Sequence, residues 1–382
     1  MPNVNTEILI WARETAGLTL EEASHVLNVS VDRLTKMENG DLSPTRNQLV
    51  KMSTKYRRPL VVFYLPNIPR PSDKGQDFRT LPRGQEGVGE KLLDALIRQM
   101  QTRQELVKSA LQEADDAEEL AFVGGSSVEN GERRLSEVIG EVLCFIRDDF
   151  RAERNVDNAF KALRAATERI GIFVILAGNL GSHHSAIPVS TFRGFSLADK
   201  VAPFIVINEN DSRSAWSFTL LHELTHILLG QTGISGYGSQ QRIESFCDSV
   251  AAAFLIQEAE IRGLWNRISR DNIDSLEAIT EFAEAYNVSR KMVAFNLLKL
   301  RLIDSGQYRD IERRLDLDRE AAVAQPRRGT PDYYVVRQHR VGPGLVSAVT
   351  KLFTEGMLSS TKAGQVLGVK PTGVSRMLRS VA

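Results

Sequence analysis

The chain has few cysteines and no long hydrophobic run. Its 382 residues include only two cysteines, Cys144 and Cys247. Two thiols so far apart do not form a disulfide framework, which favours a reducing compartment. The first residues lack a basic segment followed by an apolar stretch, so we expect no signal peptide. The longest apolar runs, such as residues 60–66, are far shorter than the roughly 20 residues of a membrane span. We therefore expect a cytoplasmic protein without membrane contact.

The chain also lacks an excess of charge of either sign. Lys and Arg total 48, and Asp and Glu total 48, so no global field attracts nucleic acid or a membrane surface. A hydrophobic fraction of 42% and a charged fraction of 25% are normal for a folded soluble protein. A chain of this length is too long to fold around one hydrophobic core, so we expect two or three domains.

Four regions follow from patterning and from the position of proline and glycine. They are a domain of short helices at 1–65, a Pro/Gly-rich linker with a helical spacer at 66–131, a domain of helices and a small sheet at 132–305, and a basic helical region at 306–382. The predicted fold class is α+β, predominantly helical. Helices are expected at 90–121, 133–149, 157–170, 211–230, 241–257, 272–286 and 289–303, and strands at 170–176, 189–197 and 201–208.

The segment LTLEEASHVLNVSVDRLTKMENG predicts helix, tight turn, helix. Thr19 has the spacing of an N-cap in a capping box. Ser24 is small where two helices would cross, and Asn28 tolerates the left-handed conformation of a tight turn. Ser30 can cap the second helix, and Gly40 can end it.

In a helix-turn-helix the second helix enters the major groove of DNA. We expect Ser30, Arg33, Thr35 and Lys36 to contact DNA, with Arg33 and Lys36 suited to guanine edges or phosphate. Residues 1–65 hold eight Lys or Arg against seven Asp or Glu, a weak excess for a DNA-binding domain. The alternative is a small helical domain used for protein contact or dimerisation.

The C-terminal segment repeats the helix, turn, helix pattern, with Gly364 and Gly368 at the small-residue and turn positions. Residues 321–382 hold nine Lys or Arg against Asp332 and Glu355. Such a basic face suits phosphate binding, although a solvated tail helix explains it equally well.

The sequence SFTLLHELTHILLG contains the candidate zinc-binding residues. His222 and His226 lie four residues apart, so on a helix both imidazoles can reach one zinc ion. Glu223 projects beside that face and can act as a general base. The apolar flanks predict a buried helix, whose histidines need partners. The alternative is a pair of core histidines satisfied by other groups.

Catalytic zinc needs three protein ligands and one open position, so a third ligand must come from elsewhere in the chain. We expect it in the downstream segment RIESFCDSVAAAFLI. Glu244 is the candidate. Asp248, four residues later, can accept the free ring N–H of a zinc-bound histidine. Alone, both residues would be interpreted as the exposed acidic edge of an amphipathic helix.

Four more residues are weaker candidates. His183 and His184 are possible extra ligands or oxyanion stabilisers, but an exposed loop pair is the better interpretation. Tyr237 could donate a hydrogen bond to the tetrahedral intermediate. Cys247 lies beside the predicted metal-binding face, where we expect a small buried residue rather than a ligand.

On HELTHILLG, on E-x-x-C-D at 244–248 and on IVIN at 205–208, the chain resembles the ImmA/IrrE-type metallopeptidases. Its N-terminal segments WARETAGLTLEEA and YRRPLVVFYLP resemble the XRE-type domain often fused to them. The resemblance implies that His222, His226 and Glu244 bind zinc and that Glu223 is the base. The chain departs from the family pattern at Cys247-Asp248, where the family often has Ala-Asn. It also departs at Ile256-Gln257, where the family often has Met-Pro.

The resemblance to this family implies two alternative functions. The first is a DNA-associated zinc endopeptidase that cleaves a repressor or an antitoxin-like protein. The second is a transcriptional regulator or antitoxin, paired with a PIN-like ribonuclease toxin, whose zinc domain is structural or sensory. We expect a homodimer in either case. The presence of Glu223 favours the first, because a structural zinc site does not need it.

Overall fold

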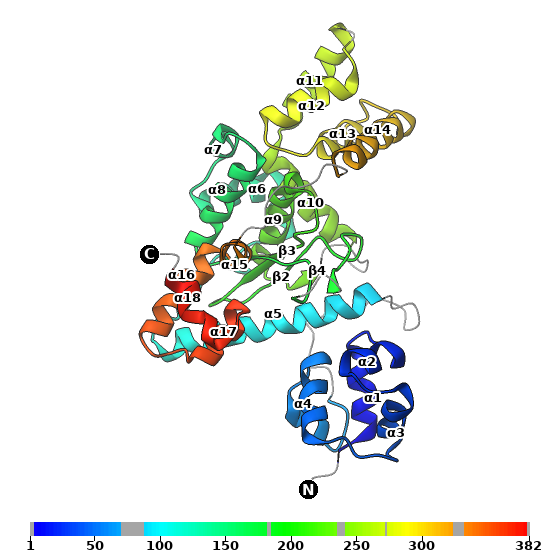
Figure 1. Cartoon of the computed structure of the whole chain (residues 1–382). Helices are drawn as coiled ribbons and strands as arrows, with labels where there is room; N and C mark the ends of the chain where they lie inside the picture. Colours follow the sequence, from blue (N-terminus) through cyan, green and yellow to red (C-terminus); the bar gives the residue numbers. More distant parts are fainter. Residues whose placement is uncertain are drawn as a thin grey trace. The chain divides into compact units, whose positions relative to one another are not determined.

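The chain folds into two compact units built mainly of helices (Figure 1). The computed structural model describes residues 4–69, 88–181, 185–234, 241–271, 273–323 and 332–379. The first unit holds Met1–Met100 and Asn179–Thr191, and the second holds Gln101–Gly178 and Phe192–Ala382. The predicted α+β fold class, predominantly helical, is confirmed. Across the described helices, none has the length and apolar composition that a membrane span needs.

Residues 4–69 form a helical domain around one apolar core. A buried ion pair ties its first and third helices together, because Arg13 Nε donates to Glu38 Oε1 at 2.7 Å. The fifth helix of this domain is a short 3-10 helix. The elements are α1 (Thr6–Thr15), α2 (Leu20–Leu27), α3 (Val31–Asn39), α4 (Arg46–Lys55) and η1 (Leu60–Tyr64).

The turn between α2 and α3 is the one that the sequence predicts. Thr19 and Glu22 form a complete capping box at the start of α2. Asn28 adopts the left-handed conformation, with φ 58° and ψ 51°. Ser30 caps α3 by accepting a hydrogen bond from the backbone N–H of Arg33, and Gly40, at φ 87°, ends it. These local choices fix the helix-turn-helix geometry.

Helix α5 (Val88–Glu113) is shorter than the helix expected at 90–121. It is followed by the acidic run that contains Asp115 and Asp116, and Asp115 takes a positive φ of 58°. Negative side chains are unfavourable at the C-terminal end of a helix, where the macrodipole is also negative. The prediction was therefore wrong for the last eight of those residues.

The second unit contains a four-stranded sheet in the order β1-β3-β2-β4. Strands β1 (Phe173–Leu176) and β3 (Phe204–Ile207) are parallel, and β2 (Gly194–Leu197) runs antiparallel to both β3 and β4 (Gly233–Ile234). Every residue of β1, β2 and β3 is buried, as expected for short apolar strands covered on both faces. Strand β4 was not predicted.

Helix α9 (Arg213–Leu228) packs against β2 and β3, and α10 (Gln241–Leu255) packs against α9 and α6 (Glu132–Leu143). Nearly all of α9 from Trp216 onwards is buried, in agreement with its apolar flanks. Helix α8 (Val156–Arg169) lies beside α9 and β1. These contacts position the histidine motif inside the unit.

The helix expected at 133–149 is broken at Cys144, which has a positive φ of 46°. A separate helix, α7 (Arg147–Ala152), follows. Its arginines bind the last carbonyls of α10. Arg147 donates to Phe254 O at 2.7 Å and to Ala253 O at 2.6 Å, and Arg151 donates to Leu255 O at 2.9 Å. These tertiary bonds explain why the chain turns before Arg147.

Four further helices complete the middle of the chain: α11 (Glu258–Asp271), α12 (Ser275–Ala285), α13 (Arg290–Lys299) and α14 (Ser305–Val323). Helix α11 was not predicted from the sequence. Its buried residues Ile261, Leu264 and Ile268 nevertheless have helical spacing.

The C-terminal residues form a packed helical region rather than a solvated tail. Gly368 takes the left-handed turn at φ 66°, and a Cβ at Gly364 would lie 2.8 Å from Val369 O. The turn therefore matches the one around Asn28. The elements are α15 (Tyr333–Val341), α16 (Pro343–Thr354), α17 (Ser360–Leu367), η4 (Pro371–Gly373) and α18 (Val374–Arg379), of which α15 and α16 contact β1.

A buried ion pair in α8 holds this region. Arg164 and Glu168 are bonded at 3.1 Å and are both almost completely buried. Arg164 also donates to the carbonyl of His339 at 2.7 Å, and Glu168 accepts from the backbone N–H of Gly344 at 2.9 Å. The pair thus joins α8 to α15 and α16.

Candidate metal centre

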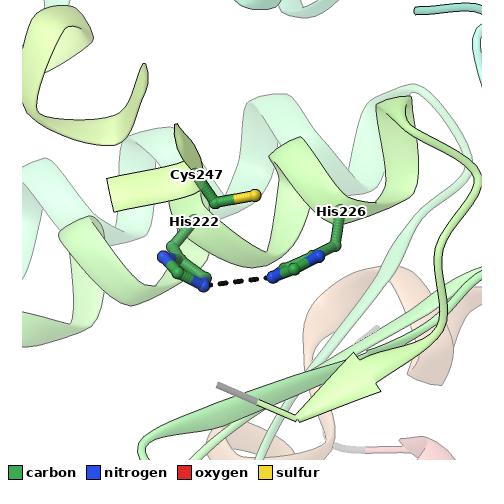
Figure 2. A group of neighbouring side chains, drawn as sticks. All are labelled: His222, His226 and Cys247. Atoms are coloured by element: carbon green, nitrogen blue, oxygen red, sulfur yellow. Dashed lines mark hydrogen bonds between the residues drawn. The ribbon is translucent and has the colours of Figure 1, made fainter. Parts of the chain in front are cut away.

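The two histidines of α9 face each other inside the second unit (Figure 2). Only 4% of His222 and 2% of His226 is exposed. Their Nε2 atoms lie 3.2 Å apart. This placement follows from the four-residue spacing on one helix and from the apolar residues around the motif.

Glu244, on the first turn of α10, places its two carboxylate oxygens beside the two histidines. Its Oε2 lies 3.2 Å from His222 Nε2, and its Oε1 lies 3.3 Å from His226 Nε2. Ligands held at about 2.0–2.1 Å around a tetrahedral zinc ion are about 3.3–3.4 Å from one another. The two histidine nitrogens therefore lie at a zinc-ligand spacing from each other, and each lies at that spacing from one oxygen of Glu244.

The hydrogen bonding of His222 also fits a cation. Its Nδ1 lies 2.9 Å from Asp248 Oδ1 and donates to that carboxylate. In a neutral ring this leaves a lone pair on Nε2, which points at the Glu244 carboxylate and at the other imidazole. Such an arrangement is repulsive unless a positive charge lies between the groups.

The electrostatics of the cluster support the same conclusion. Burial by itself lowers the pKa of His222, but hydrogen bonds to Asp248 and Glu244 and the charge of Glu223 raise it to about 10. Burial opposes ionisation of Glu244, but hydrogen bonds from His222 and His226 outweigh it and lower the pKa of Glu244 to about 2. Three carboxylates around two imidazoles thus attract positive charge, as a proton or as a metal ion.

Glu223 is completely buried next to strand β2. Gly194, the first residue of β2, makes room for it. A Cβ at Gly194 would lie 2.9 Å from Glu223 Oε1 and 2.6 Å from Thr219 Cγ2. The glycine therefore allows the carboxylate to fit between α9 and the sheet.

The predicted DNA contacts lie on α3 in the first unit. Arg33 and Lys36 are exposed, and Lys36 is paired with Asp32 at 2.9 Å. Ser30 is exposed, and its oxygen accepts from the N–H of Arg33. The hydroxyl of Thr35 donates to Val31 O. Arg33 and Lys36 are thus two solvent-exposed cations on this helix.

The two domains match known family models. Residues 168–298 match the model of the IrrE N-terminal-like domain, a peptidase family, and residues 9–63 match the model of a helix-turn-helix. The chain carries an IrrE-like peptidase domain behind an XRE-type helix-turn-helix. No curated protein and no solved structure matches the chain.

The IrrE-like domain contains all of the donor atoms described above, and it contains one more. Cys247 is completely buried, and its sulfur lies within 4.8 Å of the ligand atoms of both histidines (Figure 2). Burial raises the pKa of its thiol, and the charges of Glu244 and Glu223 raise it further. Its burial was expected, but its proximity to both rings was not. The sequence signal was its position three residues after Glu244, on the same helical face.

His183, His184 and Tyr237 lie outside the described residues. In the C-terminal region several basic side chains already have acidic partners. Arg340 pairs with Glu209 and Lys351 with Asp116. Lys362, Lys370 and Arg379 are exposed.

Proposed function

We propose that the chain is a DNA-associated zinc metalloendopeptidase that cleaves a regulatory protein of the repressor or antitoxin class. The observation that carries the proposal is the cluster of His222 Nε2, His226 Nε2 and the Glu244 carboxylate. The two nitrogens lie 3.2 Å apart, and each lies 3.2–3.3 Å from one of the two carboxylate oxygens. The buried acid Glu223 directly follows His222 in the chain, and its negative charge acts on the His222 ring. This is the donor set of a catalytic zinc site with three protein ligands.

Each residue has a defined role in this proposal. His222, His226 and Glu244 hold the ion, and Asp248 fixes the ring of His222 by accepting its Nδ1–H. When bound, zinc supplies Lewis acidity that acidifies water and polarises a peptide carbonyl. Glu223 accepts the proton of the attacking water and delivers it to the leaving amine. The wall formed by β2 and α9 limits the positions that the Glu223 carboxylate can take.

The experiment compares metal content and peptide cleavage. Elemental mass spectrometry is expected to find about one zinc per chain in the wild type and little in His222→Ala or Glu244→Ala. Glu223→Gln is expected to keep its zinc and to lose about 100-fold or more of its activity on a mixture of unfolded peptides. Full activity in Glu223→Gln would rule out this mechanism. Absence of zinc in the wild type, even after metal is added, would rule out the site.

The helix-turn-helix domain is proposed to bring the peptidase to DNA through Arg33 and Lys36 on α3. Loss of one phosphate contact reduces the slope of log affinity against log salt by about 0.9. Arg33→Ala and Lys36→Ala should therefore bind duplex DNA less tightly and with a smaller slope. Asp32→Asn should bind it more tightly, because the partner of Lys36 is removed. Arg262→Ala, which removes an exposed arginine of α11, is the control.

The second candidate is a regulator or antitoxin whose zinc centre is structural or sensory, paired with a PIN-like toxin. The proximity of Cys247 to both histidines favours it, because a fourth protein ligand closes a zinc site. In that case Glu223→Gln would leave DNA binding and zinc content unchanged, and neither the wild type nor any variant would cleave peptides.

The proposed homodimer is tested separately, by measuring the molar mass of the purified chain with light scattering.

A further inference from the structure

Cys247 lies one helical turn after Glu244 on α10, on the face that looks toward α9. Its side chain is 0% exposed, and its sulfur and one ring nitrogen from each histidine all lie within 4.8 Å of one another (Figure 2). The two histidines are themselves more than nine-tenths buried. The sulfur is thus part of a buried cluster and is not an isolated thiol.

The surroundings of this thiol are polar. Two imidazoles lie beside it, and the charges of Glu244, Glu223 and Asp248 act on it. A buried cysteine that serves only for packing normally lies among apolar side chains. Among the described residues, the sulfur of Cys247 has no hydrogen-bond partner, whereas the exposed Cys144 donates to Glu141 O at 3.6 Å.

We propose that Cys247 is a fourth ligand of the metal, so that the resting centre is closed by His222, His226, Glu244 and Cys247. This inference rests on the metal site of the proposed function. Formation of the bond breaks S–H, sends the proton to bulk water and places the sulfur electron pair on the ion, with no oxidation or reduction. Two neutral imidazoles, one carboxylate and one thiolate balance the charge of a divalent cation, which favours burial of the centre.

The consequence is regulatory. The sulfur takes the position that a catalytic zinc site keeps open for water and substrate. Hydrolysis then requires that the sulfur leaves or that the coordination expands to five. The wild-type protein is therefore a restrained peptidase, and removal of the sulfur opens the position next to Glu223.

Cobalt substitution of the full chain tests this directly, since a thiolate bound to Co²⁺ gives an intense charge-transfer band in the near ultraviolet. The band is expected in the wild type and in Cys144→Ala, which removes the other thiol. It should be lost in Cys247→Ser and Cys247→Ala, while the weaker visible bands show that Co²⁺ still binds. Two replacements are used so that a folding defect in one does not decide the result, and circular dichroism checks both.

The outcomes separate the inference from the proposed function. Visible cobalt bands without a charge-transfer band in the wild type would overturn the sulfur ligand and leave the metal site intact. A band that survives in Cys247→Ser would also overturn it. If neither the wild type nor any variant binds Co²⁺ or Zn²⁺, both proposals fail. A second readout is affinity for the soft ion Cd²⁺, which should fall more in Cys247→Ala than affinity for Zn²⁺ does.

Discussion

The Nδ1 of His222 donates to Asp248 Oδ1 at 2.9 Å, so the carboxylate decides which nitrogen of the ring faces Glu244. The side chain of Asp248 is 56% exposed, and that of His222 is only 5% exposed. The bond thus joins a surface group of α10 to a buried ring of α9. It links the two helices that carry the donor atoms.

Asp248→Ala should weaken metal binding by about 10–100-fold, the usual effect of removing the partner of a metal-bound histidine. Competition with a chelator measures the affinity. Glu258→Ala, which removes an exposed acid of α11, is the matched control and should have no effect. Equal affinity in Asp248→Ala and the wild type would show that the bond does not position the ring.

Gly194→Ala should reduce cleavage more than metal content. The added Cβ would meet Thr219 Cγ2 at 2.6 Å and Glu223 Oε1 at 2.9 Å, so the base must shift. Displacements of this kind can cost about 100-fold in rate. Kinetics and elemental analysis of the same sample provide the comparison. Gly263→Ala on α11, where a Cβ meets nothing within 4 Å, should instead stabilise the fold by up to about 1 kcal/mol.

Glu168→Gln should lower the free energy of unfolding by about 3 kcal/mol, because it leaves the guanidinium of Arg164 buried without its counter-charge. Urea unfolding measures the change. Glu137→Gln removes an exposed ion pair of α6 and should cost less than about 1 kcal/mol. A similar cost for both variants would mean that the buried pair does not hold the C-terminal helices.

The stability of the second unit should decrease in mild acid because of His339. Burial lowers the pKa of His339, and the charges of Arg164 and Arg213 lower it further. In the unfolded chain the group titrates near its ordinary value of about 6.5. Between the two values the unfolded state binds more protons, so this contribution is complete above about pH 6.5 and is lost as the pH falls toward the folded pKa.

Urea unfolding at a series of pH values measures the effect as the difference between the wild type and His339→Gln. The difference should begin to change as the pH falls below about 7, and more acidic solution should relatively stabilise the variant. His25→Gln, which replaces an exposed histidine of α2, controls for loss of a histidine as such. Parallel curves for the wild type and His339→Gln would contradict the assignment.

The elements predicted best from the sequence are those set by local rules. The turn at Asn28, the cap at Ser30 and the turn at Gly368 depend on a few neighbouring residues, and the structure has all three. The relation between His222 and His226 also follows from spacing alone. Their proximity to Glu244 and Asp248 needed one more assumption, an antiparallel return of α10, and their roles stay predictions.

The features that the sequence did not predict depend on tertiary contacts. The break at Cys144 is accompanied by bonds from Arg147 to the end of α10, more than 100 residues away. Strand β4 is two residues long and has no alternation to detect. The proximity of Cys247 to both histidines depends on how α10 packs on α9, which no local pattern encodes.

Helix α10 connects the candidate metal centre to the arginines of α7, because the two lie at its opposite ends. Glu244 lies on its first turn, and the carbonyl that Arg147 binds at Phe254 is ten residues, or about 15 Å, further along the same helix. A helix of this length transmits a displacement at one end to the other. The bonds of Arg147 at the last turn of α10 therefore help to fix the position of Glu244 on the first turn of the same helix.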